Sequence, residues 1–281
     1  MRLKTIWLLL KDTAVEWQED KASLWAAAIA FYTIFSIAPL LIIAIAIAGA
    51  VFGRDAAESQ TVTQIQELIG QQGAQAVQAI IQNAQQPGAG GTLATLFGIA
   101  TLLLGASGVF AQLQEALNVI WDVNPQPGLN IRGFLQKRLL SFAMVLVIGF
   151  LLLVSLLASA ALAAIANFFG HLFPTWIQLG RTLNFIFSLV GTTLLFALIY
   201  KVLPDLKIAW SHLWIGATIT ALLFALGKYF IGLYLGNSSI GSSYGAASSL
   251  VIVLIWVFFS AQILLLGAEF TQVYAKRNRY K

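Results

Sequence analysis

The residues AFYTIFSIAPLLI, at positions 30–42, form the first stretch whose side chains could do chemistry. Tyr32, Ser36 and Pro39 recur there at spacings of four and three, so a helix would carry them on one face. Proline has no backbone N–H, which leaves the carbonyl four residues earlier unpaired. Because lipid satisfies none of these polar groups, this face is predicted either to line a substrate path or to form a kink packed against another helix.

Other polar side chains lie near the ends of apolar segments. The stretch GASGVFAQLQEALNVIWD places Gln114, Glu115 and Asn118 at the end of one segment, and AQILLLGAEF places Gln262 and Glu269 seven residues apart on one face of another. Ionisable residues in such segments are candidate functional groups. Two interpretations stay open for the glutamates, a structural ion-pair layer and a proton relay. The complete candidate lining of a substrate path is Tyr32, Ser36, Pro39, Gln114, Asn118, Lys228, Tyr229, Tyr244 and Glu269.

Enzymatic and nucleic-acid-binding patterns are missing from the sequence. There are no cysteines, and the two histidines, His171 and His212, are predicted on opposite sides of a membrane. No zinc spacing, phosphate-binding glycine loop or pair of catalytic carboxylates is found. The basic residues flank apolar segments and form no solvated basic domain. We therefore expect no enzyme, no cofactor, no metal site and no nucleic-acid partner.

Long apolar segments must position these side chains. Of 281 residues, 59% are hydrophobic and only 10% charged, whereas soluble domains contain about 25% charged residues. A helix needs roughly 20 apolar residues to cross a bilayer. The sequence predicts an all-α polytopic membrane protein with a single membrane domain. Its six predicted transmembrane helices cover residues 23–52, 92–113, 139–169, 182–200, 209–235 and 244–270.

The distribution of basic residues predicts the topology. Most of the 16 lysines and arginines lie before the first span, between the second and third, between the fourth and fifth, or in the basic tail 271–281. The positive-inside rule then places both termini in the cytoplasm, as an even number of spans requires.

Two segments outside the spans have amphipathic patterns. Residues 1–22 carry an apolar face and lack the cleavage site of a signal peptide, so they are predicted to form either a helix at the cytoplasmic membrane surface or an elbow that orients the first span. The outer loop 53–91 has two apolar stripes separated by glycines, which predicts two short helices acting as a movable lid or a static cap. The face of the first segment comprises Leu3, Trp7, Leu10, Ala14 and Trp17.

Several stretches in order resemble the YihY/BrkB family of bacterial inner-membrane proteins. They are EWQEDKASLWAAAIAFYTIFSIAPLL, QLQEALNVIWDV, VLPD, LGKYFIGLYL and YGAASSLVIVLIWVFFSAQILLLGAE, which together extend from Glu16 to Thr271. The resemblance implies six spans, a location in the bacterial inner membrane, and membrane transport, including transport of lipid. An older label of ribonuclease BN within this family has no support in these residues.

Two functions from different classes follow as hypotheses. The first is a transporter or lipid translocator, with membrane lipids as partners. The second is a non-transporting scaffold or partner subunit of an envelope assembly, in which residues 1–22 and the outer loop would dock an envelope protein or a second copy of the chain.

Overall fold

The computed structural model describes residues 3–53, 59, 62, 66, 74–75, 77–79, 108–123, 175–206, 208–237 and 248–279. Five long helices are α1 (Leu3–Glu19), α2 (Ala22–Phe52), α6 (Thr175–Val202), α7 (Trp210–Asn237) and α9 (Ser248–Arg279). Residues 108–120 form a further helical segment, and no strand occurs in the part of the chain that the structure describes. This agrees with the predicted all-α fold. The predicted span 139–169 and most of 92–113 lie outside the described residues.

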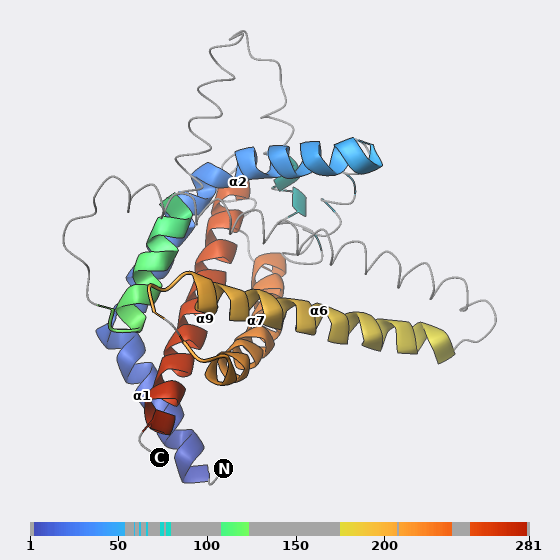
Figure 1. The fold of residues 1–281 in the computed structure, drawn as a ribbon. Helices are drawn as coiled ribbons and strands as arrows, with labels where there is room; N and C mark the ends of the chain where they lie inside the picture. The colour runs from blue at the N-terminus through green and yellow to red at the C-terminus, as the bar shows by residue number, and fades with distance from the viewer. Residues whose placement is uncertain are drawn as a thin grey trace.

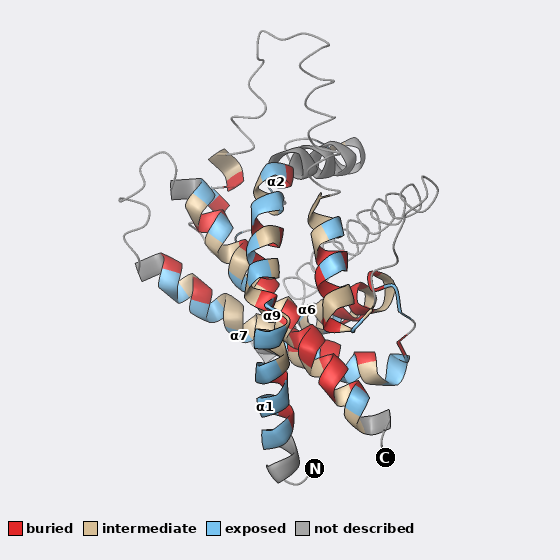
Figure 2. Ribbon diagram, turned by 90° about the vertical axis from the view of Figure 1, so that its left-hand side faces the viewer, coloured by how far each residue is buried: buried red, intermediate tan, exposed pale blue. Residues whose placement is uncertain are grey.

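Helix α9 is the central element of the arrangement (Figure 1). It contacts α7, α2 and α1, while α6 contacts α7. The two chain termini lie at the same end of the molecule (Figure 1), as an even number of spans requires. Buried positions gather where the helices meet, and exposed positions cover their outward faces (Figure 2).

Three helices are long and apolar enough to cross a membrane. Their apolar stretches are Phe185–Val202, Trp210–Leu235 and Leu250–Arg277, of which only 28%, 22% and 28% is buried inside the protein. So much exposed apolar surface requires a non-aqueous surrounding such as lipid. These stretches match the last three predicted spans. The count of six spans and the cytoplasmic location of the termini stay predictions.

Helix α2 changes direction near its middle. Its first part runs beside α9, and its second part turns away (Figure 1). Helical structure nevertheless continues through Pro39 to Phe52. A sharp bend in a continuous helix is usually caused by proline, which agrees with the kink expected from the sequence.

Helices α7 and α9 approach closely through paired glycines. Gly216 of α7 lies against Thr271 of α9, and Gly267 of α9 lies against Thr220 of α7. Neither glycine has room for a Cβ atom. Close approach of this kind through small residues is typical of membrane helix pairs. The hydroxyl of Tyr200 joins α6 to this contact by donating to the Leu264 carbonyl at 2.7 Å.

The outer loop packs onto the helices through one of its predicted apolar stripes. Its described positions 59, 62, 66, 74–75 and 77–79 are helical. Ala74 and Val77 are buried, and Val77 packs with Ala30 of α2 and Val257 of α9. The static cap and the movable lid both stay predictions.

The apolar face predicted for residues 1–22 points mainly outward. Trp7 and Leu10 are exposed, whereas Leu9 and Thr13 are buried. Helix α1 also contacts α9 and α2. The helix therefore combines features of both interpretations: an apolar outer face suited to a membrane surface, and an inner face that holds it against the bundle.

Candidate functional site

An acidic cluster forms where α1, the 108–123 segment and the C-terminal part of α9 meet. Two of its carboxylates come from unusual turns. Asp20 lies beside Lys21, and Asp122 ends its own helix. Lys21 and Asp122 are the non-glycine residues with positive φ, at 53° and 52°, in the described part of the chain. Such backbone conformations are rare outside glycine and tend to occur at functional sites.

Hydrogen bonds at the end of the 108–123 segment hold Asp122 in its turn. The Val123 N–H donates to the Asn118 carbonyl at 2.9 Å, and the Asp122 N–H donates to the Val119 carbonyl at 3.0 Å. This pair of bonds is a Schellman motif with aspartate at the position that glycine usually occupies. The motif directs the Asp122 carboxylate toward α9.

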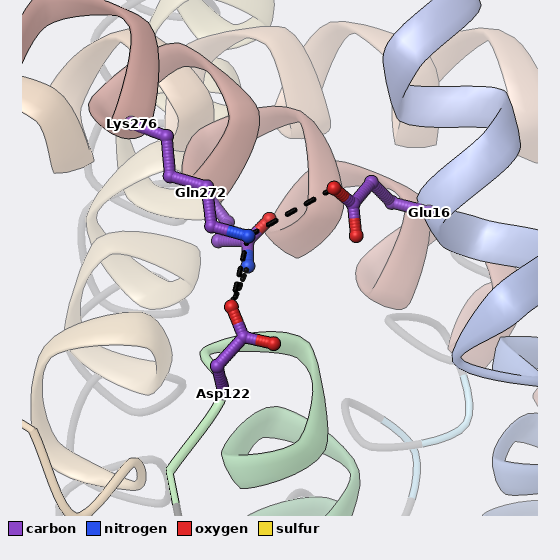
Figure 3. Close-up of polar contacts among 4 residues, drawn as sticks. All are labelled: Glu16, Asp122, Gln272 and Lys276. Atoms are coloured by element: carbon purple, nitrogen blue, oxygen red, sulfur yellow. Dashed lines mark hydrogen bonds and ion pairs between the residues drawn. The ribbon is translucent and has the colours of Figure 1, made fainter. Parts of the chain in front are cut away.

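Lys276 is the cation of the cluster, and it connects two of its carboxylates (Figure 3). Its Nζ lies 2.8 Å from Oδ2 of Asp122 and 3.8 Å from Oε1 of Glu16. The Gln272 side-chain amide donates to the same Asp122 oxygen at 3.1 Å (Figure 3). These contacts join α1, α9 and the 108–123 segment at one point.

Glu269 is the buried member of the cluster. Its relative exposure is 0%, and neither carboxyl oxygen has a hydrogen-bond partner among the described residues. Side-chain atoms without a partner also occur on the neighbouring segments, namely Trp17 Nε1, Asp20 Oδ2, Trp121 Nε1 and Gln272 Oε1. Buried polar groups are nearly always satisfied in proteins, so a concentration of exceptions at one place marks a candidate site.

The surroundings of Asp20 raise the pKa of its carboxyl group. Burial raises the pKa of this carboxyl above its usual value, and the negative charges of Glu16 and Asp122 raise it further. Lys276 acts in the opposite direction, but it does not outweigh them. The cluster therefore holds more negative charge than its single cation compensates.

Gln114 and Asn118, both predicted to line a substrate path, bind Asp205 in the turn after α6. The Gln114 amide donates to Asp205 Oδ1 at 3.1 Å, and the Asn118 amide donates to Oδ2 at 3.0 Å. The backbone N–H of Asp205 returns a 2.8 Å bond to the Asn118 side-chain oxygen. This Asp205 clamp fixes the 108–123 segment, and with it Asp122, against α6 and α7.

The Tyr32 face of α2 is engaged in packing where its side chains are described. Ser36 is buried and its hydroxyl reaches the carbonyls of Tyr32 and Thr33, at 3.2 and 3.1 Å. The Tyr32 ring lies where a side chain on Gly108 would be. Pro39 lies within α2. The Tyr32 contact connects α2 to the 108–123 segment. The two interpretations of this face, a substrate path and a packed kink, stay predictions.

Lys228 lies at a separate place, a cavity between α6 and α7. The cavity measures about 210 Å³ and is lined by Phe185, Ser188, Leu189, Thr192, Ala221, Phe224, Ala225 and Lys228. The Lys228 ammonium lies 5.8 Å from the centre of the Phe224 ring. The adjacent Tyr229 is largely exposed. Tyr244 lies outside the described residues.

The structure thus divides the predicted site residues among several places, and it adds three that sequence reasoning did not single out. Asp122, Asp205 and Lys276 organise the clamp and the cluster. Lys201 is engaged elsewhere, since it donates to the Ile208 carbonyl and lies over the Trp210 ring. No three histidine or acidic side chains in the described ranges are arranged to hold a metal ion.

Comparison with known proteins gives consistent matches over most of the chain. A model of the family described as virulence factor BrkB matches residues 13–281. The chain is 28% identical over 269 residues to the UPF0761 membrane protein of Aeromonas salmonicida, which covers 90% of this chain and 84% of the relative. No solved structure matches.

Other UPF0761 membrane proteins are longer than this chain. The protein of Tolumonas auensis is 33% identical over 181 residues, covering 63% of this chain and 56% of the relative. That of Verminephrobacter eiseniae is 28% identical over 258 residues, covering 90% and 58%. The chain therefore spans little more than half the length of these two relatives.

Proposed function

The chain belongs to the family described as virulence factor BrkB, and on that premise we propose that this bacterial integral membrane protein is a transporter that translocates lipid. The names of its relatives say only that they are membrane proteins. The proposal therefore depends on the chemistry of the site.

The Lys228 cavity is the observation that carries this proposal. It lies between two helices whose apolar stretches are long enough to span a bilayer. Its lining combines a cationic ammonium with the hydroxyls of Ser188 and Thr192 and with apolar walls. A phospholipid has matching parts, an anionic phosphate and acyl chains, and lysine is a common ligand for phosphate.

The size of the cavity favours part of a lipid over a whole small molecule. Ligand pockets usually measure about 300–1,000 Å³, whereas this one measures about 210 Å³. A headgroup could enter it while the acyl chains stay among the exposed apolar side chains of α6 and α7, such as Phe185 and Phe230. The acyl chains of a lipid bound in this way would remain in apolar surroundings.

Lipid flux in proteoliposomes tests the proposal. Purified protein would be reconstituted with a fluorescent phospholipid, and movement of the probe between leaflets would be followed by quenching from outside. Lys228→Ala should lower the rate about tenfold, since a charge-assisted hydrogen bond contributes about 1.5 kcal/mol. Lys228→Arg should retain most of the flux.

Leu226→Ala is the matched control. Leu226 is exposed on α7 and does not line the cavity, so its truncation should leave flux within about twofold of wild type. Wild-type protein without lipid flux, or Lys228→Ala with full flux, would contradict the proposal.

The scaffold alternative has weaker support in the described residues. Ala74 and Val77 of the outer loop are buried against the protein's own helices, so they are not available for docking. The exposed Trp7 and Leu10 of α1 could face a partner, but they equally suit a membrane surface. We assign no catalytic chemistry to this protein.

A further inference from the structure

The burial of Glu269 requires a physical explanation. The residue lies in the apolar stretch Leu250–Arg277 of α9, is fully buried, and has no partner for either oxygen among the described residues. Burying an unpaired carboxylate costs far more than burying a neutral acid. Such a group is therefore stabilised by a cation or by a proton.

The charged groups around Glu269 are mostly negative. Glu16 of α1, Asp20 of the following turn and Asp122 of the 108–123 segment all act on it, and Lys276 is the cation that opposes them. From α7, the titratable ring of His212 packs against Tyr274 at 5.9 Å. Lys276 is already engaged with Asp122 and Glu16. The positive charge of Lys276 is therefore divided among three carboxyl groups, those of Asp122, Glu16 and Glu269.

A proton fits this surrounding better than a metal ion. The described residues contain no group of three acidic or histidine side chains suited to a metal. The unpartnered atoms on the segments that form the cluster also include two indole N–H donors, of Trp17 in α1 and Trp121 beside Asp122, which cannot coordinate a cation. Donors and acceptors together are what water molecules need to connect a buried acid to the outside.

We propose that Glu269 is a proton-binding site, from which the proton exchanges with water at the end of the molecule where both termini lie. The proton leaves one carboxyl oxygen of Glu269 for water or for the carboxylate of Asp20, and no other bond changes. Asp20 and Gln272 position this exchange through their unpartnered oxygens.

Release of the proton has a structural consequence. It adds a further negative charge to the cluster, and this charge competes with Asp122 and Glu16 for Lys276. Movement of Lys276 toward Glu269 would weaken the contact that joins α1 and the 108–123 segment to α9. Protonation of Glu269 would thereby be coupled to the helix arrangement and, in the transporter proposed above, to lipid movement. Only this coupling rests on the proposed function.

Infrared difference spectroscopy tests the proton site directly. Spectra of the reconstituted full-length chain, recorded during acid-to-alkaline titration, should contain a protonated carboxyl band that disappears in Glu269→Gln. Glu115→Gln, which changes an exposed glutamate, is the control and should leave that band in place. In Asp20→Asn the band should disappear at a lower pH than in wild type, because one negative neighbour has been removed.

The outcomes separate this proposal from the proposed function. A band that is unchanged in Glu269→Gln overturns the proton site. If Glu269→Gln does not fold, a band that does not move in Asp20→Asn overturns it. Lipid flux that depends on pH in wild type and is independent of pH in Glu269→Gln supports the coupling. If wild type shows no lipid flux, the proposed transport is refuted. If the band is nevertheless lost in Glu269→Gln, the proton site is still supported.

Discussion

The Lys228 cavity between α6 and α7 and the acidic cluster around Glu269 of α9 both hold ionisable side chains within the bundle, yet their surroundings differ. Lys228 borders a cavity with aromatic and hydroxyl walls. Glu269 is closely surrounded by protein, with carboxylates as neighbours. Gly227, the neighbour of Lys228, packs against Ile263 of α9, which precedes Glu269 by six residues, a helical rise of about 9 Å.

This difference shows how one apolar bundle can hold opposite charges for different purposes. A lysine beside a cavity can keep its charge by reaching water, a ring face or an anionic ligand. A carboxyl group without space around it has no such outlet, so its charge state depends on neighbouring residues. The first arrangement suits binding of a ligand, and the second suits a response to protons.

The largest expected effect comes from a substitution that disrupts both regions together. In Gly267→Ala, the new methyl group would collide with Thr220 and the Tyr200 hydroxyl, and α7 would be forced away from α9. We expect a loss of about 1–3 kcal/mol in the free energy of unfolding, measured by thermal unfolding in detergent. Gly232→Ala is the control, since nothing lies within 4 Å of its added Cβ. Equal stability of the two variants would contradict the close packing.

A substitution with a smaller expected effect on stability should disturb the acidic cluster alone. Asp205→Ala removes the acceptor for Gln114 and Asn118, which frees the segment that carries Asp122. Because this site is exposed, we expect a loss of about 1 kcal/mol, seen as a lower unfolding temperature.

Lipid flux separates the two regions in this variant. The Lys228 cavity does not include Asp205 or its partners, so flux at fixed pH should be reduced less in Asp205→Ala than in Lys228→Ala. The opposite order would show that the two regions are not independent.

The smallest effect is a pH dependence that belongs to Asp20. Since its pKa is raised in the folded state, the folded protein holds this proton more tightly than the unfolded chain. The free energy of unfolding should therefore fall as pH rises from the usual pKa of 3.8 through the raised native value. Asp20→Asn should remove this contribution.

Thermal unfolding at about pH 4 and about pH 7 measures the effect. The change in unfolding temperature of Asp20→Asn between these two pH values should differ from that of wild type by at most about 3 °C, because solvent screens a partly exposed carboxyl group. Asp12→Asn, at an exposed position of α1, should behave as wild type does. If Asp20→Asn and wild type show the same pH response, Asp20 does not interact with the other charges of the cluster.

The sequence was sufficient to predict features that depend on local composition. Long apolar stretches predicted α6, α7 and α9, because length and hydropathy alone decide whether a helix can span lipid. Pro39 predicted the bend of α2, since a missing N–H acts on its own helix. Val77, which belongs to one apolar stripe of the outer loop, is buried, and the other residues of that stripe lie outside the described residues.

The features that could not be predicted depend on contacts between distant residues. Nothing local pairs Lys276 with Asp122 or Asp205 with Asn118, which lie 87 residues apart in the chain. The left-handed turns at Lys21 and Asp122 could not be predicted from the sequence either, because glycine usually occupies such positions. Glu269 was placed near a membrane boundary, and its full burial became visible only with α1 packed beside α9.

The threonine–glycine contacts between α7 and α9 also limit how the protein can move. Thr271 fits beside Gly216 and Thr220 beside Gly267, at matched heights on two helices. Axial translation of one helix past the other would bring each threonine against a larger residue. Within the described part of the chain, α7 and α9 are therefore expected to move together as one rigid body.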